Sequence, residues 1–308
     1  MKILVTGGSG FIGRNFIEHI AREHPDYEIV EFSRSNANER LAQRMTKYTF
    51  VKGDITDSEK VEEAMRGADI VFHLAGKSYI GSNETREEIF ETNVQGTINI
   101  LNPAQKNKVR VIVPSSADVY GNDTEKMFKE SDGAVDGKNA YSDSKIEVEK
   151  EARKYASKGL HVVILRPNNV FGPWQRPPKI IPNIIIKLLR GEKVGINGDG
   201  SNLRQYLYID DFCRAMKLLA EKGKSGEVYN AGGDEEVSNL KLAERIAEML
   251  NCEKERIELL RDKDSGVLRR QINSEKLRAL GWTQKIGFDE GLKKTIDWYM
   301  ANKGFLCS

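Results

Sequence analysis

Short apolar runs alternate with stretches of helical periodicity through the first half of the chain. The runs are rich in β-branched residues, which favour strands, and cover Lys2 to Thr6, Glu28 to Ser33, Thr49 to Lys52, Ile70 to Leu74, Val109 to Ser115 and His161 to Arg166. Strands that alternate with helices predict βαβ units and a parallel sheet. After Pro167 the pattern changes to loops rich in Gly, Pro and Asn, with helical periodicity near Pro182 to Arg190 and near Asp289 to Ala301.

A glycine-rich turn separates the first predicted strand from the first predicted helix. Gly7, Gly10 and Gly13 stand in the segment GGSGFIG, directly before the amphipathic stretch Phe16 to Ile20. Glycine permits a tight turn and lets the backbone approach a pyrophosphate, whose charge the N–H groups of the helix stabilise. The order of strand, glycine turn and helix therefore predicts a dinucleotide-binding site.

These patterns predict an α/β protein with a Rossmann-type, doubly wound parallel sheet and a smaller α/β C-terminal part that binds substrate. We expect residues 1–166 to form the dinucleotide-binding domain, with 206–232 returning to it. Residues 167–205 and 233–308 are then expected to form the substrate-binding domain.

The end of the second predicted strand bears on which dinucleotide is bound. An acid about 20 residues after the glycines favours NAD, because it holds the ribose 2′-hydroxyl. If the strand ends at Ser33, the hydroxyl of Ser33 and the guanidinium of Arg34 suit a 2′-phosphate and favour NADP, which is our preferred interpretation. If the strand ends sooner, Glu31 takes the role of the acid and favours NAD.

Composition narrows the class of protein. With 48 basic and 46 acidic residues among 308, the net charge of +2 does not indicate binding to nucleic acid or to an anionic membrane. No apolar run approaches the roughly 20 residues of a membrane span, and the first strand begins at once, so we expect a cytoplasmic protein. Cys213, Cys252 and Cys307 are odd in number and far apart, which is typical of reduced structural thiols, and we expect no metal site.

A tyrosine and a lysine stand at a spacing that suits general-base chemistry. Tyr141 and Lys145 are four positions apart, which places both on one face of a helix. A tyrosine has a pKa of about 10, and a neighbouring cation together with a positive nicotinamide ring lowers it towards the working range of a base. Upstream, Ser116 follows a predicted strand and supplies a hydroxyl for the same substrate oxygen.

These motifs, with others that span nearly the whole chain, resemble the extended short-chain dehydrogenases that act on nucleotide-linked sugars. The motifs are TGGSGFIG, KGDITD, FHLAG, TNVQGTINIL, PSSADVYG, RPNNVFGP, GDGSNLRQYLYIDD and VYNAGG. This family, the NAD-dependent epimerases and dehydratases, includes 4-epimerases, 4,6-dehydratases and 4-ketoreductases. The resemblance implies that Tyr141 exchanges a proton with the sugar 4-hydroxyl while hydride passes between carbon 4 and nicotinamide, with Ser116 and Lys145 as the other catalytic residues.

The resemblance also implies the binding residues. Those expected at the cofactor are Gly7, Gly10, Phe11, Ile12, Gly13, Ser33, Arg34, Asp54, Ile55, Leu74, Ala75, Gly76, Asn93, Tyr141 and Lys145. Those expected at the substrate are Lys77, Ser116, Asn169, Lys179, Arg204 and Arg269, with Arg270 as the alternative to Arg269. The substrate expected is a UDP- or dTDP-linked hexose, and the family suggests a homodimer formed through helices near 87–101 and 141–158.

One departure from the family bears on the reaction. The 4,6-dehydratases that the chain resembles follow their catalytic hydroxyl with Asp-Glu, two acids that support loss of water, whereas Ser116 is followed by Ala117 and Asp118. The segment GKSYIGS and the Ser-Ala pair resemble a 4-epimerase, which is our first hypothesis. An NADPH-dependent 4-ketoreductase is second, because of Ser33 and Arg34. A dehydratase and a non-catalytic cofactor sensor are the remaining alternatives.

Overall fold

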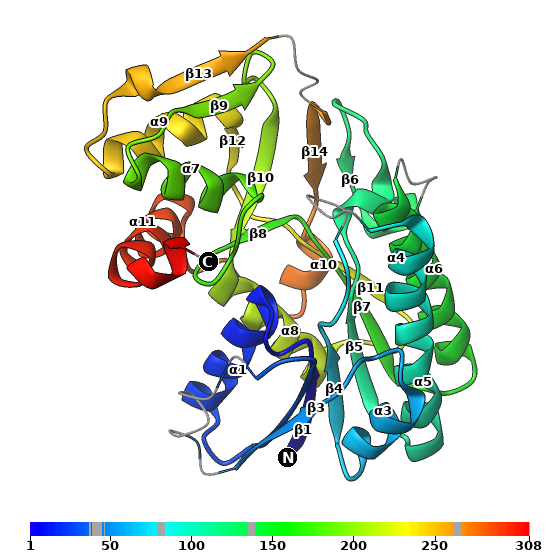
Figure 1. Cartoon of the computed structure of the whole chain (residues 1–308). Coiled ribbons are helices and arrows are strands. Elements are labelled where there is room, and N and C mark those ends of the chain that lie inside the picture. The colour runs from blue at the N-terminus through cyan, green and yellow to red at the C-terminus, as the bar shows by residue number, and fades with distance from the viewer. Residues whose placement is uncertain are drawn as a thin grey trace.

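The computed structural model describes residues 1–36, 38, 45, 47–78, 84–134, 139–261 and 266–307. Its larger layer is a seven-stranded sheet in the order β11-β7-β5-β4-β1-β2-β3, in which every pair of neighbours is parallel (Figure 1). The strands are β1 (Lys2–Thr6), β2 (Glu28–Ser33), β3 (Tyr48–Lys52), β4 (Ile70–His73), β5 (Arg110–Pro114), β7 (Val162–Pro167) and β11 (Val228–Ala231).

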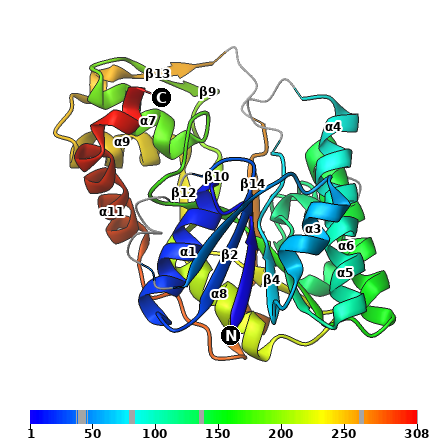
Figure 2. The ribbon, with the colours of Figure 1, turned by 60° about the horizontal axis from the view of Figure 1, so that its bottom comes forward.

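Helices cover both faces of this sheet (Figure 2). They are α1 (Phe11–Glu23) and α8 (Ile209–Lys222) on one face, and α3 (Ser58–Met65), α5 (Gly96–Asn107) and α6 (Ala140–Ser157) on the other. Side chains alternate along β1, so Ile3 and Val5 join the first core while Leu4 joins the second. Because each such side chain contributes about 1.5–3 kcal/mol when fully buried, this two-sided burial fixes the register of the strand.

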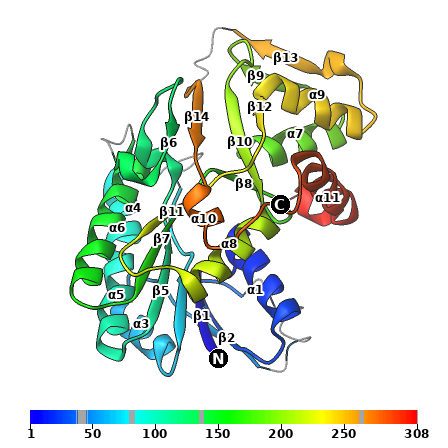
Figure 3. The same cartoon turned by 180° about the vertical axis from the view of Figure 1, so that it is seen from behind.

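A second layer of short strands stands beside the carboxyl ends of the large sheet (Figures 1 and 3). It contains β6 (Met127–Phe128), β8 (Asn169–Phe171), β10 (Leu203–Tyr208), β12 (Glu236–Ser238) and β14 (Arg269–Ile272), with β9 (Val194–Asn197) paired to β13 (Ile257–Leu260). Helices α7 (Ile180–Leu189), α9 (Asn239–Met249), α10 (Glu275–Arg278) and α11 (Phe288–Ala301) accompany these strands. Strand β14 pairs with β10 on one side and with β6 on the other, which connects residues far apart in the sequence.

The predicted α/β fold with a parallel, doubly wound sheet is confirmed. Each of the six predicted strands is present with ends within one residue of the predicted ones, and β1 and β2 coincide with their predictions. Strand β11 pairs with β7, so residues 228–231 do return to the large sheet. The division into domains at residues 166 and 232 stays a prediction.

Candidate active site

The glycine turn after β1 is packed too closely for any larger side chain. Gly7 has a φ of +70°, and a Cβ on it would lie 2.7 Å from the backbone of Ala75. A Cβ on Gly13 would lie 2.2 Å from the carbonyl oxygen of Gly7. Three glycines thus bring the turn against the start of α1, where free N–H groups and the helix dipole suit a pyrophosphate. The turn fits the dinucleotide that the sequence predicts.

A small cavity beside this turn has the position expected for the adenosine of a dinucleotide. Its volume is about 170 Å³, and it is lined by Gly7, Ser9, Gly10, Phe32, Ser33, Arg34, Gly53, Asp54, Ile55, Leu74, Ala75, Gly76, Lys77 and Thr92. The structure therefore brings together nine of the predicted cofactor residues, while Phe11 and Ile12 line a neighbouring, larger cavity. The backbone N–H of Ser9 donates to the Ser33 hydroxyl over 3.2 Å, which holds that side chain at the rim of the glycine turn.

Glu31 does not take the role of the ribose-binding acid, because β2 runs to Ser33. The Glu31 side chain is fully buried and accepts hydrogen bonds from Asn38 Nδ2, at 2.6 Å, and from the Tyr48 hydroxyl. A Cβ on Gly8 would lie 2.6 Å from Glu31 Cγ, so the glycine turn covers this carboxylate. The condition for the Glu31 alternative, a strand that ends before Ser33, is therefore not met, and Glu31 does not line the cavity beside the turn.

Asn93 lies near the cleft, as predicted, but it acts through the backbone. It belongs to the π-helical turn η1 (Glu91–Gln95) between α4 (Arg86–Phe90) and α5, and such turns frequently occur at functional sites. Its Oδ1 accepts from Lys77 N over 2.7 Å, and its Nδ2 donates to Lys77 O over 3.0 Å and to Ser144 Oγ over 2.9 Å. Asn93 therefore holds the Gly76–Lys77 backbone against α6.

The larger cavity, of about 430 Å³, lies between the carboxyl ends of the large sheet and the second layer. The predicted residues that line it are Phe11, Ile12, Leu74, Ala75, Gly76, Lys77, Ser116, Tyr141, Lys145, Asn169 and Lys179. Gln175 and Tyr206 line it as well and were not predicted. The Tyr206 hydroxyl is buried and makes no hydrogen bond with the described residues. In the sequence, only its position in the motif LRQYLYIDD could have indicated this.

Tyr141 and Lys145 project from the first turns of α6, whose N-cap is Asn139. The Asn139 side chain accepts from Ser142 N over 3.0 Å, which fixes the start of the helix at this point. Lys145 Nζ donates to the carbonyl oxygen of Pro114 over 3.0 Å, at the end of β5, and lies 5.9 Å from the centre of the Tyr141 ring. Both residues therefore meet at the end of the strand that leads to Ser116.

Burial governs the ionisation of this pair. It lowers the pKa of Lys145 to about 8, against the opposing effect of the Glu149 carboxylate. The pKa of Tyr141 is raised by burial and by the charge of Asp118, against a hydrogen bond with Ser116. The sequence argument expected Lys145 to lower the pKa of Tyr141, and in the structure the cost of burying a phenolate outweighs that effect.

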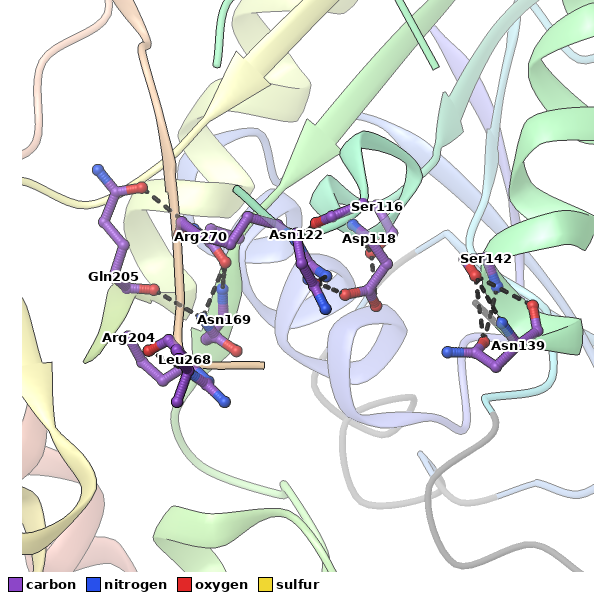
Figure 4. A network of polar contacts seen from close by, with 12 residues as sticks. Ser116, Asp118, Asn122, Asn139, Ser142, Asn169, Arg204, Gln205, Leu268 and Arg270 are labelled. Carbon is purple, nitrogen blue, oxygen red and sulfur yellow. Dashed lines mark hydrogen bonds and ion pairs between the residues drawn. The ribbon is translucent and has the colours of Figure 1, made fainter. Parts of the chain in front are cut away.

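The loop after β5 carries Ser116, Ala117 and Asp118 into a short 3₁₀ helix, η2 (Ala117–Tyr120). The Ser116 hydroxyl donates to Asp118 Oδ2 over 3.2 Å and accepts from Asp118 N over 3.1 Å. Arg270 forms an ion pair with Asp118, as Figure 4 shows from close by. Ala117 is buried and lines the cavity, so the position of the first dehydratase acid holds only a methyl group.

Cationic side chains from the second layer lie around this cavity. Lys179 precedes α7 and lines the cavity, and burial lowers its pKa. Arg204 comes from β10 and does not line the cavity itself, and its Nη1 donates to Leu203 O over 2.8 Å. Burial lowers the pKa of Arg204 as well. Figure 4 places Arg204 beside Asn169, whose Nδ2 donates to Gln205 O over 3.0 Å. Cations held in this way suit a diphosphate.

Arg269 does not lie where the sequence prediction placed it. Its Nη2 donates to Glu236 Oε2 over 2.6 Å, and it is Arg270 that contacts Asp118 in the cavity wall. Neighbouring side chains on a strand point to opposite faces, so β14 can direct only one of the two arginines to the site. Neither arginine lines the cavity, and Arg270 is the one that contacts its wall through Asp118. The assignment of Arg269 or Arg270 to the substrate stays a prediction.

Other residues that the sequence singled out are accounted for by packing. His73 is buried between the hydroxyls of Thr6 and Thr97, and burial lowers its pKa to about 3. Trp174 stacks against the Arg14 guanidinium, 3.2 Å from the ring centre, and is not part of the cavity wall. In the segment GKSYIGS, residues 79–82 lie outside the described residues.

Within the described parts of the chain, no group of three or more His, Cys, Asp or Glu side chains is placed to hold a metal ion. None of the helices described is long and apolar enough to cross a membrane. Cys213 is buried and Cys252 is half-buried, both as free thiols, and the side chain of Cys307 lies outside the described residues.

Comparison with known proteins gives one family. The model of the NAD-dependent epimerase/dehydratase family matches residues 3–232. Human dTDP-D-glucose 4,6-dehydratase is 34% identical over 98% of this chain and 90% of its own length. The structure of dTDP-glucose 4,6-dehydratase from Streptomyces venezuelae with NAD bound superposes with a TM-score of 0.92 at 33% identity, covering 99% of this chain and 98% of that one. UDP-glucose 4-epimerase from Thermotoga maritima, with UDP-glucose, gives 0.89 at 28% identity, covering 98% and 100%. The relatives named above are enzymes that act on nucleotide sugars. The chain belongs to the NAD-dependent epimerase/dehydratase family.

Proposed function

We propose that this protein interconverts the carbon 4 epimers of a nucleotide-linked hexose. The observation that carries the proposal is the loop after β5. It keeps the Ser116 hydroxyl beside Tyr141 and Lys145, but it places the methyl group of Ala117 where a dehydratase has its first acid. Oxidation and reduction at carbon 4 need a base and an oriented hydroxyl, whereas loss of water needs further acid–base groups.

The residues have separate tasks in this proposal. Tyr141 takes the proton of the 4-hydroxyl, and Ser116, which lines the same cavity, orients the same oxygen. Lys145 supplies a positive charge behind the phenol and donates to Pro114 O. A dinucleotide bound at the glycine turn would supply hydride exchange with carbon 4 and a positive ring that favours the phenolate of Tyr141, whose pKa burial raises.

A 4,6-dehydratase is the second candidate, because relatives with that name match almost the whole chain at 31–34% identity. Asp118 is the remaining acid in this loop, and its carboxylate is bound by Arg270 and by the Ser116 hydroxyl. A dehydratase mechanism would have to free this carboxylate before it could act on the sugar.

Product analysis decides between the candidates. The purified protein is incubated with UDP- and dTDP-hexoses and with their 4-keto derivatives, each with and without added NADPH. The products are separated, and their masses are measured by mass spectrometry. We expect a product of unchanged mass with the opposite configuration at carbon 4, and no net consumption of cofactor. A product that has lost the mass of water establishes the dehydratase, and consumption of one NADPH per 4-keto sugar reduced establishes the ketoreductase.

We also propose that the adenosine cavity accepts NADP in preference to NAD. Support comes from Ser33 and Arg34, which line this cavity at the end of β2, while the acid Glu31 is covered by the glycine turn. Solved structures of related enzymes contain NAD, so the preference is a property proposed for this chain alone. A 2′-phosphate would meet the guanidinium of Arg34 and the hydroxyl of Ser33.

The substitution Ser33→Asp is expected to reverse this preference. A carboxylate at this position repels a 2′-phosphate and accepts hydrogen bonds from a free ribose, so the ratio of the NAD and NADP dissociation constants should change about 100-fold in favour of NAD. Calorimetric titration of nucleotide-free protein measures both constants. As a second arm, Arg34→Leu should weaken NADP alone. If neither substitution alters the ratio, the proposal is wrong.

The substrate and the assembly are proposals of the same kind. Lys179 lines the cavity with a cation that suits the diphosphate of a UDP- or dTDP-hexose, and Arg204 lies beside Asn169 of the cavity wall. A cytoplasmic homodimer formed through α4, α5 and α6 agrees with the family pattern. Sedimentation at a mass of only 34.8 kDa would argue against the dimer.

A further inference from the structure

The loop that carries Ser116 is attached to the last strand of the second layer. Beyond η2 the chain forms β6, which pairs in parallel with β14 through Met127 and Gln271 and through Phe128 and Ile272. Asn273 N also donates to Phe128 O over 2.8 Å. Figures 1 and 3 show β6 and β14 side by side above the large sheet. The position of the loop therefore depends on residues near the C-terminal end of the fold.

Arg270 makes the contact nearest to the proposed catalytic residues. Its Nη1 binds the Asp118 carboxylate, its Nε donates to Gly121 O over 2.7 Å, and its Nη2 donates to Asn122 Oδ1 over 3.0 Å. Three nitrogen atoms of one planar group thus hold both ends of η2 (Figure 4). The Arg270 side chain is 13% exposed and the Asp118 side chain is 38% exposed, so water screens this ion pair in part.

Asp118 is linked in turn to Tyr141. The Asp118 carboxylate accepts from the Ser116 hydroxyl over 3.2 Å, and Ser116, Asp118 and Tyr141 all line the same cavity. A negative charge at Asp118 disfavours a phenolate at Tyr141, and a cation bound to Asp118 opposes that effect. Contacts thus join Arg270 to Asp118 and Asp118 to Ser116, and the charge of Asp118 acts on Tyr141 in the cavity.

We propose that Arg270 is a positioning residue that neutralises the acidic charge of Asp118 beside Tyr141 and holds Ser116 in place for proton transfer. The inference deepens the proposed function, since it rests on Tyr141 as the base. The inference concerns the pairing of Asp118 with Arg270 in this chain. Arg270 lies beyond residues 3–232, which the family model matches, and outside the glycine motif.

Other charged groups around the pair do not replace Arg270. Lys145 faces Tyr141 from the same helix and Lys179 faces Asp118 from the segment before α7, but burial lowers the pKa of each of them. Arg204 on β10 is close enough to interact with Asp118, and it is directed to backbone carbonyls. His73, behind Lys145, is held neutral by burial, which lowers its pKa to about 3. Arg270 is the cation that contacts the Asp118 carboxylate directly.

The substitution Arg270→Gln is therefore expected to move the acid limb of the pH–rate profile upward. Without the guanidinium, the free charge of Asp118 raises the pKa of Tyr141, so a higher pH is needed for the same fraction of phenolate. We expect a shift of about one pH unit, and a kcat about tenfold lower on the acid limb, with KM changed less than about threefold. Asp118→Asn should shift the limb in the opposite direction, and the double variant should follow Asp118→Asn.

Arg269→Gln is the matched control, because the neighbouring arginine binds Glu236 on the other face of β14. To separate this inference from the proposed reaction, the ionisation of Tyr141 is also followed by NMR in protein labelled at tyrosine Cζ, with oxidised dinucleotide bound and Tyr141→Phe to assign the signal. Thermal unfolding shows whether each variant is folded, and Asp118→Asn tests the pair if Arg270→Gln is not.

The outcomes are distinct. An upward shift of the Tyr141 signal in Arg270→Gln, reversed by Asp118→Asn and absent in Arg269→Gln, supports the inference even if the product assay identifies a reaction other than epimerisation. An unchanged titration in both Arg270→Gln and Asp118→Asn, or an equal shift in Arg269→Gln, overturns it. If Tyr141→Phe does not affect turnover, the proposed function is refuted. The NMR titration still tests whether Arg270 controls the ionisation of Tyr141.

Discussion

Replacement of Tyr141 by phenylalanine is expected to lower kcat about 10³-fold. The dissociation constants of dinucleotide and nucleotide sugar should stay within about threefold of their original values. A positioned general base contributes typically 10²–10⁴-fold to rate, and the phenol ring itself remains to fill its place at the start of α6. The measurement is steady-state turnover together with calorimetric titration of both ligands.

Tyr206→Phe is the matched control for this result. Tyr206 lines the same cavity and is almost fully buried, and its hydroxyl makes no hydrogen bond, so its removal should lower kcat less than about tenfold. A protein that only senses its cofactor would keep its nucleotide response in both variants and show no turnover to lose. Turnover that survives Tyr141→Phe would contradict the assignment of the base.

Replacement of Glu149 by leucine is expected to lower the free energy of unfolding by about 3–5 kcal/mol. Glu149 and Arg166 are both fully buried, and Arg166 donates to the two carboxylate oxygens over 2.7 and 2.6 Å. Glu149 also accepts from the Ser115 hydroxyl over 2.7 Å. The substitution leaves the Arg166 cation buried between β7 and α6 without a counter-charge. Denaturant unfolding measures the change.

Two further variants test this explanation. Arg153 also binds Glu149, over 3.0 Å, but its side chain is 43% exposed, so Arg153→Ala should cost less than about 1 kcal/mol. In the double variant Glu149→Leu with Arg166→Met, both charges are removed and most of the stability should return, because a buried ion pair and a packed apolar pair are often close in free energy. If the double variant is as unstable as Glu149→Leu, packing rather than charge accounts for the loss.

The strands of the large sheet were predictable because helices cover them on both faces. An uninterrupted apolar run such as Ile70 to Phe72 is typical of a strand that helices cover on both faces. The glycine turn identifies the strand before it as the first strand of the sheet. The short strands β6, β8, β12 and β14 were not predicted. Runs of two to four residues carry no usable periodicity, and their partners lie far away in the sequence.

The site residues also divide into those that the sequence could locate and those that it could not. Tyr141 and Lys145 stand at the start of a helix, and Ser116 follows the end of a strand. Both are local features, so the motifs in the sequence could locate these three residues. The binding of Asp118 by Arg270 depends on which face of β14 meets η2. Two adjacent arginines on a strand point to opposite faces, and the sequence does not indicate which of them faces η2. Likewise, the pKa of Tyr141 depends on burial, which spacing does not reveal.

The pairing of β14 with β6 also has a consequence for biosynthesis. Asp118 and Arg270 are separated by 152 positions, so about half of the chain must leave the ribosome between the catalytic loop and the arginine that holds it. The large sheet also lacks its edge strand β11 until residue 231 has emerged. During translation, the nascent chain must therefore carry an unfinished cavity for most of its elongation, and premature termination anywhere before β14 leaves a protein that has the glycine turn but not the assembled reaction centre.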